Sequence, residues 1–136
     1  MALATFLHLL RSHSIEDERL ERQYRTQVGS VATQVHAVFD DWMALREIEP
    51  DYGRLANAAA VNRWELMKLA AQVERLVPSR ALGHVQRDMH AALLKAARAC
   101  QLLANGYRFH KSGAVCDGQA LLLETLETLD GLAREF

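Results

Sequence analysis

The longest hydrophobic pattern in this chain is a series of apolar residues spaced alternately four and three positions apart. The series consists of Tyr24, Val28, Val31, Val35, Val38, Trp42 and Leu45. Because an α-helix turns once every 3.6 residues, this spacing places the whole series on one side of a helix. Strict alternation of apolar and polar residues, the pattern of a half-buried strand, does not occur over a comparable length. The sequence therefore predicts an all-α fold.

The same periodicity divides the rest of the chain into further amphipathic helices. We expect a long helix over about 15–48, a second over 52–76, a third that begins near residue 79 and a fourth over 118–134. Short connections between helices favour antiparallel neighbours. We therefore predict one domain over 1–136, an antiparallel up-down-up-down four-helix bundle with a short N-terminal amphipathic segment.

Proline, aspartate and an Asn-Gly pair indicate where these helices begin and end. Pro50 and Asp51 separate the first two helices, and Asp51 is a favourable N-cap. Pro78 marks the start of the third helix. Its end is left open, because Asn-Gly at 105–106 is a C-cap signal but the helix could also continue to residue 111.

The N-terminal residues form a short amphipathic segment of their own. Over 3–11, four apolar residues share one helical face, and polar residues follow at 12–14. We expect this polar stretch to interrupt the helix, with Ser14 and Asp17 capping the long helix after it. The segment lacks the basic start and the cleavage site of a signal peptide, so we expect it in the mature protein. Residues 1–13 then act as a docking segment, through Leu3, Phe6, Leu7 and Leu10.

Composition and charge narrow the classes of function. The net charge is −1, so the chain lacks the excess of Lys and Arg that general binding to nucleic acid requires. No apolar run approaches the roughly 20 residues of a membrane span. Cys100 and Cys116 are the two cysteines, and their expected places, inside the third helix and beyond its end, do not favour a disulfide. Free thiols fit a reducing compartment, and we expect a cytoplasmic protein.

Charge is unevenly distributed between the last two helices. Residues 79–111 carry a net charge of +5 and residues 112–136 a net charge of −4. An outward stripe of the third helix consists of Arg80, His84, Arg87, Lys95 and Arg98. Such a stripe could follow phosphates, but no aromatic residues interleave with it and the acidic helix is expected alongside. We interpret the stripe as a solvated face that forms ion pairs with its neighbours.

Two pairs of residues have a spacing that could hold a metal ion. His36 with Asp40, and His84 with Asp88, lie four positions apart and so share a helix face. The hydrophobic pattern of each helix turns these pairs outward, and the Glu-x-x-His pairs of di-iron bundles are absent. We therefore expect solvated surface pairs, with no metal and no cofactor.

The remaining polar residues suggest a pocket or a nucleophile. Asn62, His90 and Cys100 could line a pocket between the helices, which would make the protein a small-ligand or metal-binding bundle. Cys116 and His110 are neighbours in sequence, but little there would lower the pKa of the thiol. We expect the aromatic residues of 107–111 to close the end of the bundle. No catalytic constellation is found, and we do not expect an enzyme.

The order of these features resembles a pattern in uncharacterised bacterial four-helix-bundle proteins of unknown function. The stretch Leu76–Leu129 has Pro78 at a helix start, a histidine in that helix (His84 or His90), many alanines and Gly106 near the helix end. The resemblance implies a four-helix domain and carries over no catalytic residue. Many of these proteins are exported, whereas a signal peptide is missing here.

These features favour a non-enzymatic protein that acts through protein–protein contact, with self-association to a homodimer as the leading hypothesis. The first long helix, of about 34 residues, exceeds the second, of about 25, so its start is expected to project past the bundle. The interface is expected there, at the apolar N-terminal residues together with Leu20 and Tyr24. The alternative is the ligand-binding or metal-binding bundle described above.

Overall fold

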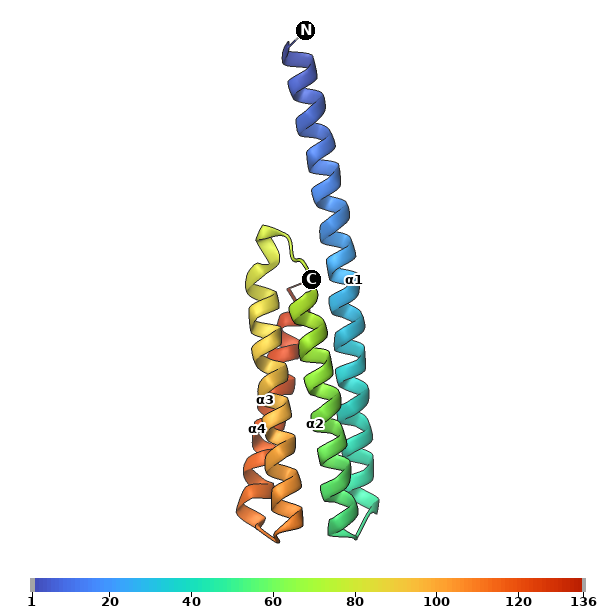
Figure 1. The fold of residues 1–136 in the computed structure, drawn as a ribbon, viewed down its shortest axis with the longest axis vertical. Coiled ribbons are helices and arrows are strands. Elements are labelled where there is room, and N and C mark those ends of the chain that lie inside the picture. Colours follow the sequence, from blue (N-terminus) through green and yellow to red (C-terminus); the bar gives the residue numbers. More distant parts are fainter. Residues whose placement is uncertain (1, 136) are drawn as a thin grey trace.

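The computed structural model describes the backbone of residues 2–135 and the side chains of residues 15–135. Within that range it contains four α-helices and no strand. The helices are α1 Ala2–Ile48, α2 Tyr52–Arg75, α3 Gly83–Arg108 and α4 Ser112–Ala133, and a short 3-10 helix, η1, spans Arg80–Leu82. Figure 1 shows consecutive helices running in opposite directions beside the lower part of α1. The predicted all-α four-helix bundle is confirmed.

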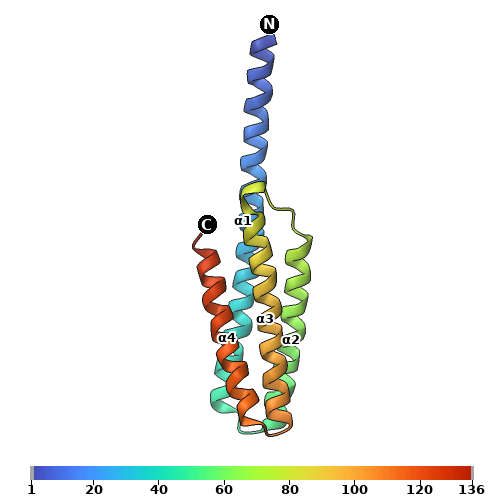
Figure 2. The ribbon, with the colours of Figure 1, turned by 90° about the vertical axis from the view of Figure 1, so that its left-hand side faces the viewer.

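The helix α3 is the most closely packed of the four. It contacts α2 and α4 along its length, whereas α1 contacts α2 less closely and α4 least of all. In Figure 2, α3 lies between α4 and α2. The close packing follows from the small buried side chains of α3, which are Ala92, Ala96, Ala97, Ala99 and Ala104. Alanine lets neighbouring backbones approach, while the larger side chains of α1 hold it further from them.

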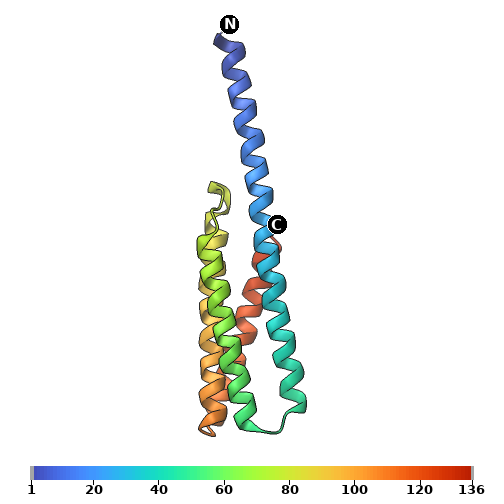
Figure 3. The same ribbon diagram turned by 45° about the vertical axis from the view of Figure 1, so that its right-hand side comes forward.

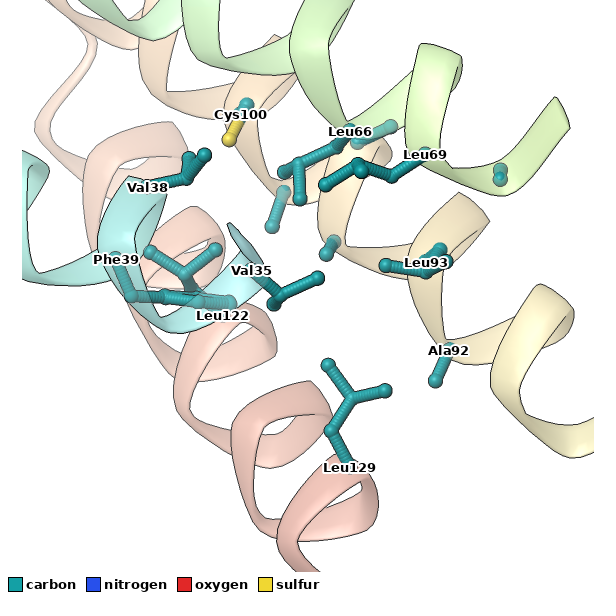
Figure 4. Close-up of a cluster of buried hydrophobic side chains, with 14 of the residues drawn as sticks. Val35, Val38, Phe39, Leu66, Leu69, Ala92, Leu93, Cys100, Leu122 and Leu129 are labelled. Atoms are coloured by element: carbon teal, nitrogen blue, oxygen red, sulfur yellow. The ribbon is translucent and has the colours of Figure 1, made fainter. Parts of the chain in front are cut away.

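The core is built from the apolar series that the sequence shows. Tyr24, Val28, Val31, Val35 and Trp42 are each 2% exposed or less, Val38 is buried, and Leu45 is half-buried. Figure 4 shows side chains from all four helices meeting in this core, among them Val35, Val38, Leu66, Leu69, Leu93, Leu122 and Leu129. Each fully buried Val or Leu contributes about 1.5–3 kcal/mol of hydrophobic free energy. Within residues 2–135, no helix combines the length and the hydropathy that a membrane span requires.

The expected interruption at residues 12–14 is wrong. The helix α1 is continuous from Ala2 to Ile48, and Ser14 lies inside it, not at its start. Serine and histidine in a helix interior cost only a fraction of a kcal/mol each relative to alanine. With neither glycine nor proline in this stretch, that cost is too small to stop a helix that continues on both sides. The separate N-terminal segment is therefore part of α1.

The observed start of α2 agrees with the prediction from Asp51, whereas the Asn-Gly pair at 105–106 does not end α3. Asp51 caps α2 as predicted, because its Oδ1 accepts a hydrogen bond from the backbone N–H of Arg54 at 3.2 Å. The helix α3 continues past the Asn-Gly pair and ends at Arg108. Gly106 has a packing role instead, since a Cβ added there would lie 2.6 Å from Cγ2 of Val115 on α4.

The turn that follows α3 is formed by His110. Its φ of 53° lies in the left-handed region, where glycine is the usual residue. The next backbone N–H, that of Lys111, donates to the carbonyl oxygen of Gly106 at 2.8 Å, which is the hydrogen bond of a Schellman motif. The chain therefore turns from α3 into α4 on a histidine in a conformation that costs a side-chain-bearing residue about 1–2 kcal/mol.

Candidate functional site

The helix α1 projects well beyond the bundle. Figure 1 and Figure 3 show its N-terminal part passing the α2–α3 connection and the end of α4, with no other helix beside it. Tyr24 is the first buried residue among the described side chains, so we call residues 2–23 the projecting segment. Within its described part, Ile15 is 59% exposed and Leu20 is 46% exposed.

Tyr24 fixes the point where the projecting segment leaves the bundle. Its side chain is 1% exposed, and its hydroxyl donates to Oε1 of Gln86 on α3 at 3.3 Å. The amide of Gln86 in turn donates to the backbone oxygen of Glu74 on α2 at 3.4 Å. Burial raises the pKa of Tyr24 and keeps its hydroxyl protonated. Tyr24 was expected at the partner surface, but the structure places it in the core of the bundle.

A cleft of about 700 Å³ lies between the projecting segment and the α2–α3 connection. Asp17, Leu20 and Glu21 line it on the α1 side, and residues 77–81 line it on the other. Val77, in that connection, is 86% exposed. The exposed apolar side chains of Leu20 and Val77 thus border one concave surface that carries carboxylates on its α1 side.

Ion pairs within α1 support the projecting segment as a helix. Arg19 pairs with Glu16 and Arg25 pairs with Glu21, each at 2.8 Å. Pairs three or four positions apart contribute about 0.2–0.5 kcal/mol each at a helix surface. They favour the helix but do not replace the burial that a neighbouring helix would provide. The expected interface residues Leu3, Phe6, Leu7 and Leu10 lie outside the described side chains.

His90 and Cys100, two of the three expected pocket residues, do not meet in one site. Cys100 is 3% exposed, and burial raises the pKa of its thiol to about 12. Figure 4 shows its sulfur in the apolar core, with Val38 and Leu66 in the same cluster. Nε2 of His90 lies 3.9 Å from Oε2 of Glu74 on α2. His90 is ten positions from Cys100 on α3, about 15 Å along the helix, and Asn62 is half-buried on α2.

The two histidines with metal-ligand spacing pair with acidic residues near the C-terminal end of the chain. Nε2 of His36 lies 3.0 Å from Oδ1 of Asp130, and Nε2 of His84 lies 2.9 Å from Oε2 of Glu135. Their expected partners, Asp40 and Asp88, are not part of these contacts. In the part of the chain with described side chains, three or more metal-ligating residues do not gather in any group. Both histidines instead connect the end of α4 to the rest of the bundle.

Aromatic residues meet at the opposite end of the bundle. The ring of Tyr107 lies 6.0 Å from that of Trp42 and 5.5 Å from that of Tyr52, and Tyr52 lies 5.4 Å from the ring of His110. A shallow cleft of about 620 Å³ adjoins this cluster. The prediction that aromatics close the bundle end holds for Tyr107, which is 8% exposed, but is wrong for Phe109, which is 60% exposed.

Sequence reasoning missed the cleft beside Leu20 and the partners of the two histidines. The cleft depends on how α1 and the α2–α3 connection come together, and only Pro78 marked that connection in the sequence. The histidine partners lie 94 and 51 positions away, beyond any local pattern.

Comparisons of this chain with known proteins give no match to a family model, a curated protein or a solved structure. The resemblance to bacterial four-helix-bundle proteins is therefore untested. The site must be interpreted from its own geometry, which offers an exposed helix and an adjoining cleft lined by apolar and charged residues.

Proposed function

We propose that this protein is non-enzymatic and acts through protein–protein contact, as a homodimer joined through the projecting segment of α1. The observation that carries the proposal is that α1 projects from the bundle with Ile15 and Leu20 exposed, and that Leu20 also lines a cleft. A helix of this length without tertiary contacts is marginal in water. A second helix alongside would bury these apolar side chains and stabilise both segments.

The charge order of the projecting segment supports an antiparallel pair. The charged residues on the Leu20 side of the helix are Glu16 and Asp17, which lie four and three positions before it. In a parallel pair each residue lies level with its own copy, so these carboxylates would face the same carboxylates of the second chain. An antiparallel pair separates them and avoids this repulsion.

The hydrophobic pattern before Leu20 extends this contact. Because α1 is continuous, the helical repeat brings the apolar sequence positions Leu3, Phe6 and Leu10 into line with Tyr24. In the antiparallel arrangement these positions of one copy lie against the projecting segment of the other. The cleft between Leu20 and the α2–α3 connection would then receive part of the second helix.

We also place this dimer in the cytoplasm. The supporting observation is that Cys100 and Cys116 both have free thiols in the structure, the first buried and the second exposed. Free thiols are typical of proteins in reducing compartments.

Light scattering coupled to gel filtration tests the dimer. We expect the mass of two chains at tens of micromolar, and the mass of one chain for Leu20→Glu, which places two carboxylates at the centre of the contact. Leu123→Glu on α4 is the matched control, since Leu123 is 57% exposed and lies outside the projecting segment. A monomeric wild-type protein, or equal dissociation of both variants, would contradict the proposal.

A further inference from the structure

The net charge of −1 conceals a strong separation of charge across the bundle. The helices α2 and α3 together carry eight Lys and Arg and three Asp and Glu. The helices α1 and α4 together carry five Arg and eleven Asp and Glu. Because α2 packs along α3, the two basic helices lie together on one side of the molecule.

The centre of this basic side is apolar. Trp64 lies nine positions from both Leu55 and Val73, which are buried, so it is two and a half turns away and points out of α2. Leu94 has the same relation to the buried Val85 and Leu103 on α3. The exposed fractions are 61% for Trp64 and 39% for Leu94.

Val61 and Met67 enlarge the apolar centre. Their side chains are 56% and 41% exposed. The antiparallel contacts of Glu74 with His90 and of Tyr52 with His110 set the register of α2 and α3. That register brings Met67 level with Leu94, so the apolar residues of the two helices form one patch.

Basic side chains surround this patch. Lys68 lies over the ring of Trp64, with Nζ 4.1 Å from the ring centre. Arg75 on α2 and Arg87 and Arg98 on α3 are exposed and occupy the same outward side by helical spacing. We call the patch and these cations the α2–α3 face, which consists of Val61, Trp64, Met67, Lys68, Arg75, Arg87, Leu94 and Arg98.

Two of the three acidic residues of α2 and α3 lie at the edges of this face. Glu65 lines a cleft between α1 and α2, which Lys68 also borders, and Asp88 lines a cleft between α3 and α4. The third, Glu74, lies at the seam between α2 and α3, where it faces His90. The outward surface of the two helices therefore carries more cations than carboxylates around its apolar centre.

We propose that the α2–α3 face docks on the surface of an anionic lipid bilayer. Lys and Arg near such a surface are attracted to its negative potential, and an exposed tryptophan is favoured at the headgroup level. The acidic side formed by α1 and α4 would face away from the bilayer, which orients the molecule. This proposal does not depend on the dimer.

A bilayer fits this face better than an acidic protein helix. Trp64, Met67 and Leu94 are not among the residues that line the four clefts described above. Recognition of a protein helix relies on a groove that receives its apolar anchors. A broad surface with cations around exposed apolar side chains matches the amphipathic pattern of interfacial binding.

The test uses the full chain with vesicles of phosphatidylcholine containing about one-third phosphatidylserine. We expect co-sedimentation with these vesicles, loss of binding at high salt, and no binding to pure phosphatidylcholine. Trp64 supplies a fluorescence signal, because Trp42 is only 2% exposed and its environment should change little on binding. Binding should shift the tryptophan emission to shorter wavelength, and Trp64→Phe should remove that shift.

Charge-removing variants distinguish binding through the α2–α3 face from a general electrostatic attraction of the protein to the vesicles. Arg87→Gln with Arg98→Gln should weaken partitioning by roughly 25-fold, since each cation at the surface is worth about five-fold. Arg46→Gln with Arg134→Gln removes the same charge from outside the face and should have little effect. Equal weakening by both pairs, equal binding to uncharged vesicles, or binding to polyglutamate without binding to vesicles would overturn the proposal. The last result would indicate an acidic protein partner.

Discussion

The imidazole of His110 lies 5.4 Å from the ring of Tyr52, and the backbone that carries it is left-handed, with a φ of 53°. The contact joins the start of α2 to the turn between α3 and α4. The favourable ring contact and the unfavourable backbone conformation act on the same residue, so a pair of substitutions can separate them.

Replacing His110 with glycine or with alanine removes the ring in both cases, but only alanine keeps the left-handed strain. We expect His110→Gly to unfold at higher denaturant than His110→Ala, by about 1 kcal/mol in the free energy of unfolding. Chemical denaturation of both variants measures the difference. Equal stability would show that this residue is not left-handed in solution.

Gly106 should resist enlargement. A Cβ there would lie 2.6 Å from Cγ2 and 2.9 Å from the backbone nitrogen of Val115, and that nitrogen cannot move without moving α4. We expect Gly106→Ala to lower the free energy of unfolding by about 1–3 kcal/mol. Gly29→Ala on α1 is the control, since nothing lies within 4 Å of its added Cβ. That control should stabilise the protein by about 1 kcal/mol, and a similar gain at Gly106 would argue against the close packing of α3 and α4.

The two cysteines should differ in reactivity and in their effect on stability at high pH. Cys116 is exposed, whereas burial raises the pKa of Cys100 to about 12, so one thiol should react with a thiol reagent near pH 8 and the second only after unfolding. Mass spectrometry of the labelled protein checks this. Two thiols reacting at equal rates in the folded protein would contradict the buried position of Cys100.

The raised pKa also sets the sign of the pH effect. In the folded protein Cys100 stays protonated above its ordinary pKa of 9, while in the unfolded chain it ionises there. Unfolding then releases a proton, so the stabilisation present below pH 9 is progressively lost as the pH rises toward 12. Burial raises the pKa of Tyr24 and Tyr107 as well, which adds to the loss. Cys100→Ala should make the free energy of unfolding fall less steeply over this range.

The parts of the fold that depend on neighbouring residues could be predicted from the sequence. The series from Tyr24 to Trp42 fixes the buried side of α1, and Asp51 fixes the start of α2, because each signal acts within a few residues. The break expected at residues 12–14 does not occur, because the low helix propensity of serine and histidine costs less than interrupting a helix that continues on both sides. A polar stretch without proline or glycine does not end a helix.

The parts that depend on contacts between helices could not be predicted. The sequence around Gly106 is the same whether the glycine ends a helix or admits Val115, and only the position of α4 decides between them. His36 and His84 likewise had acidic residues four positions away but pair across the bundle. Of the two bundle-end residues expected at the interface, Leu20 is exposed, whereas Tyr24 is buried with the rest of the apolar series of α1 and donates a hydrogen bond to Gln86.

Because α1 is continuous, the number of residues between two positions fixes the angle between them around the helix axis. Each residue between Ser14 and Tyr24 rotates the N-terminal end by about 100° about the helix axis and moves it by about 1.5 Å. A single inserted residue would therefore swing the apolar positions near the N-terminus away from the side that Tyr24 faces, although no side chain had been changed. An insertion of seven residues would return them to within about 20° of that side. The number of residues in this segment therefore determines which side of the molecule its apolar positions face, as much as their identity does.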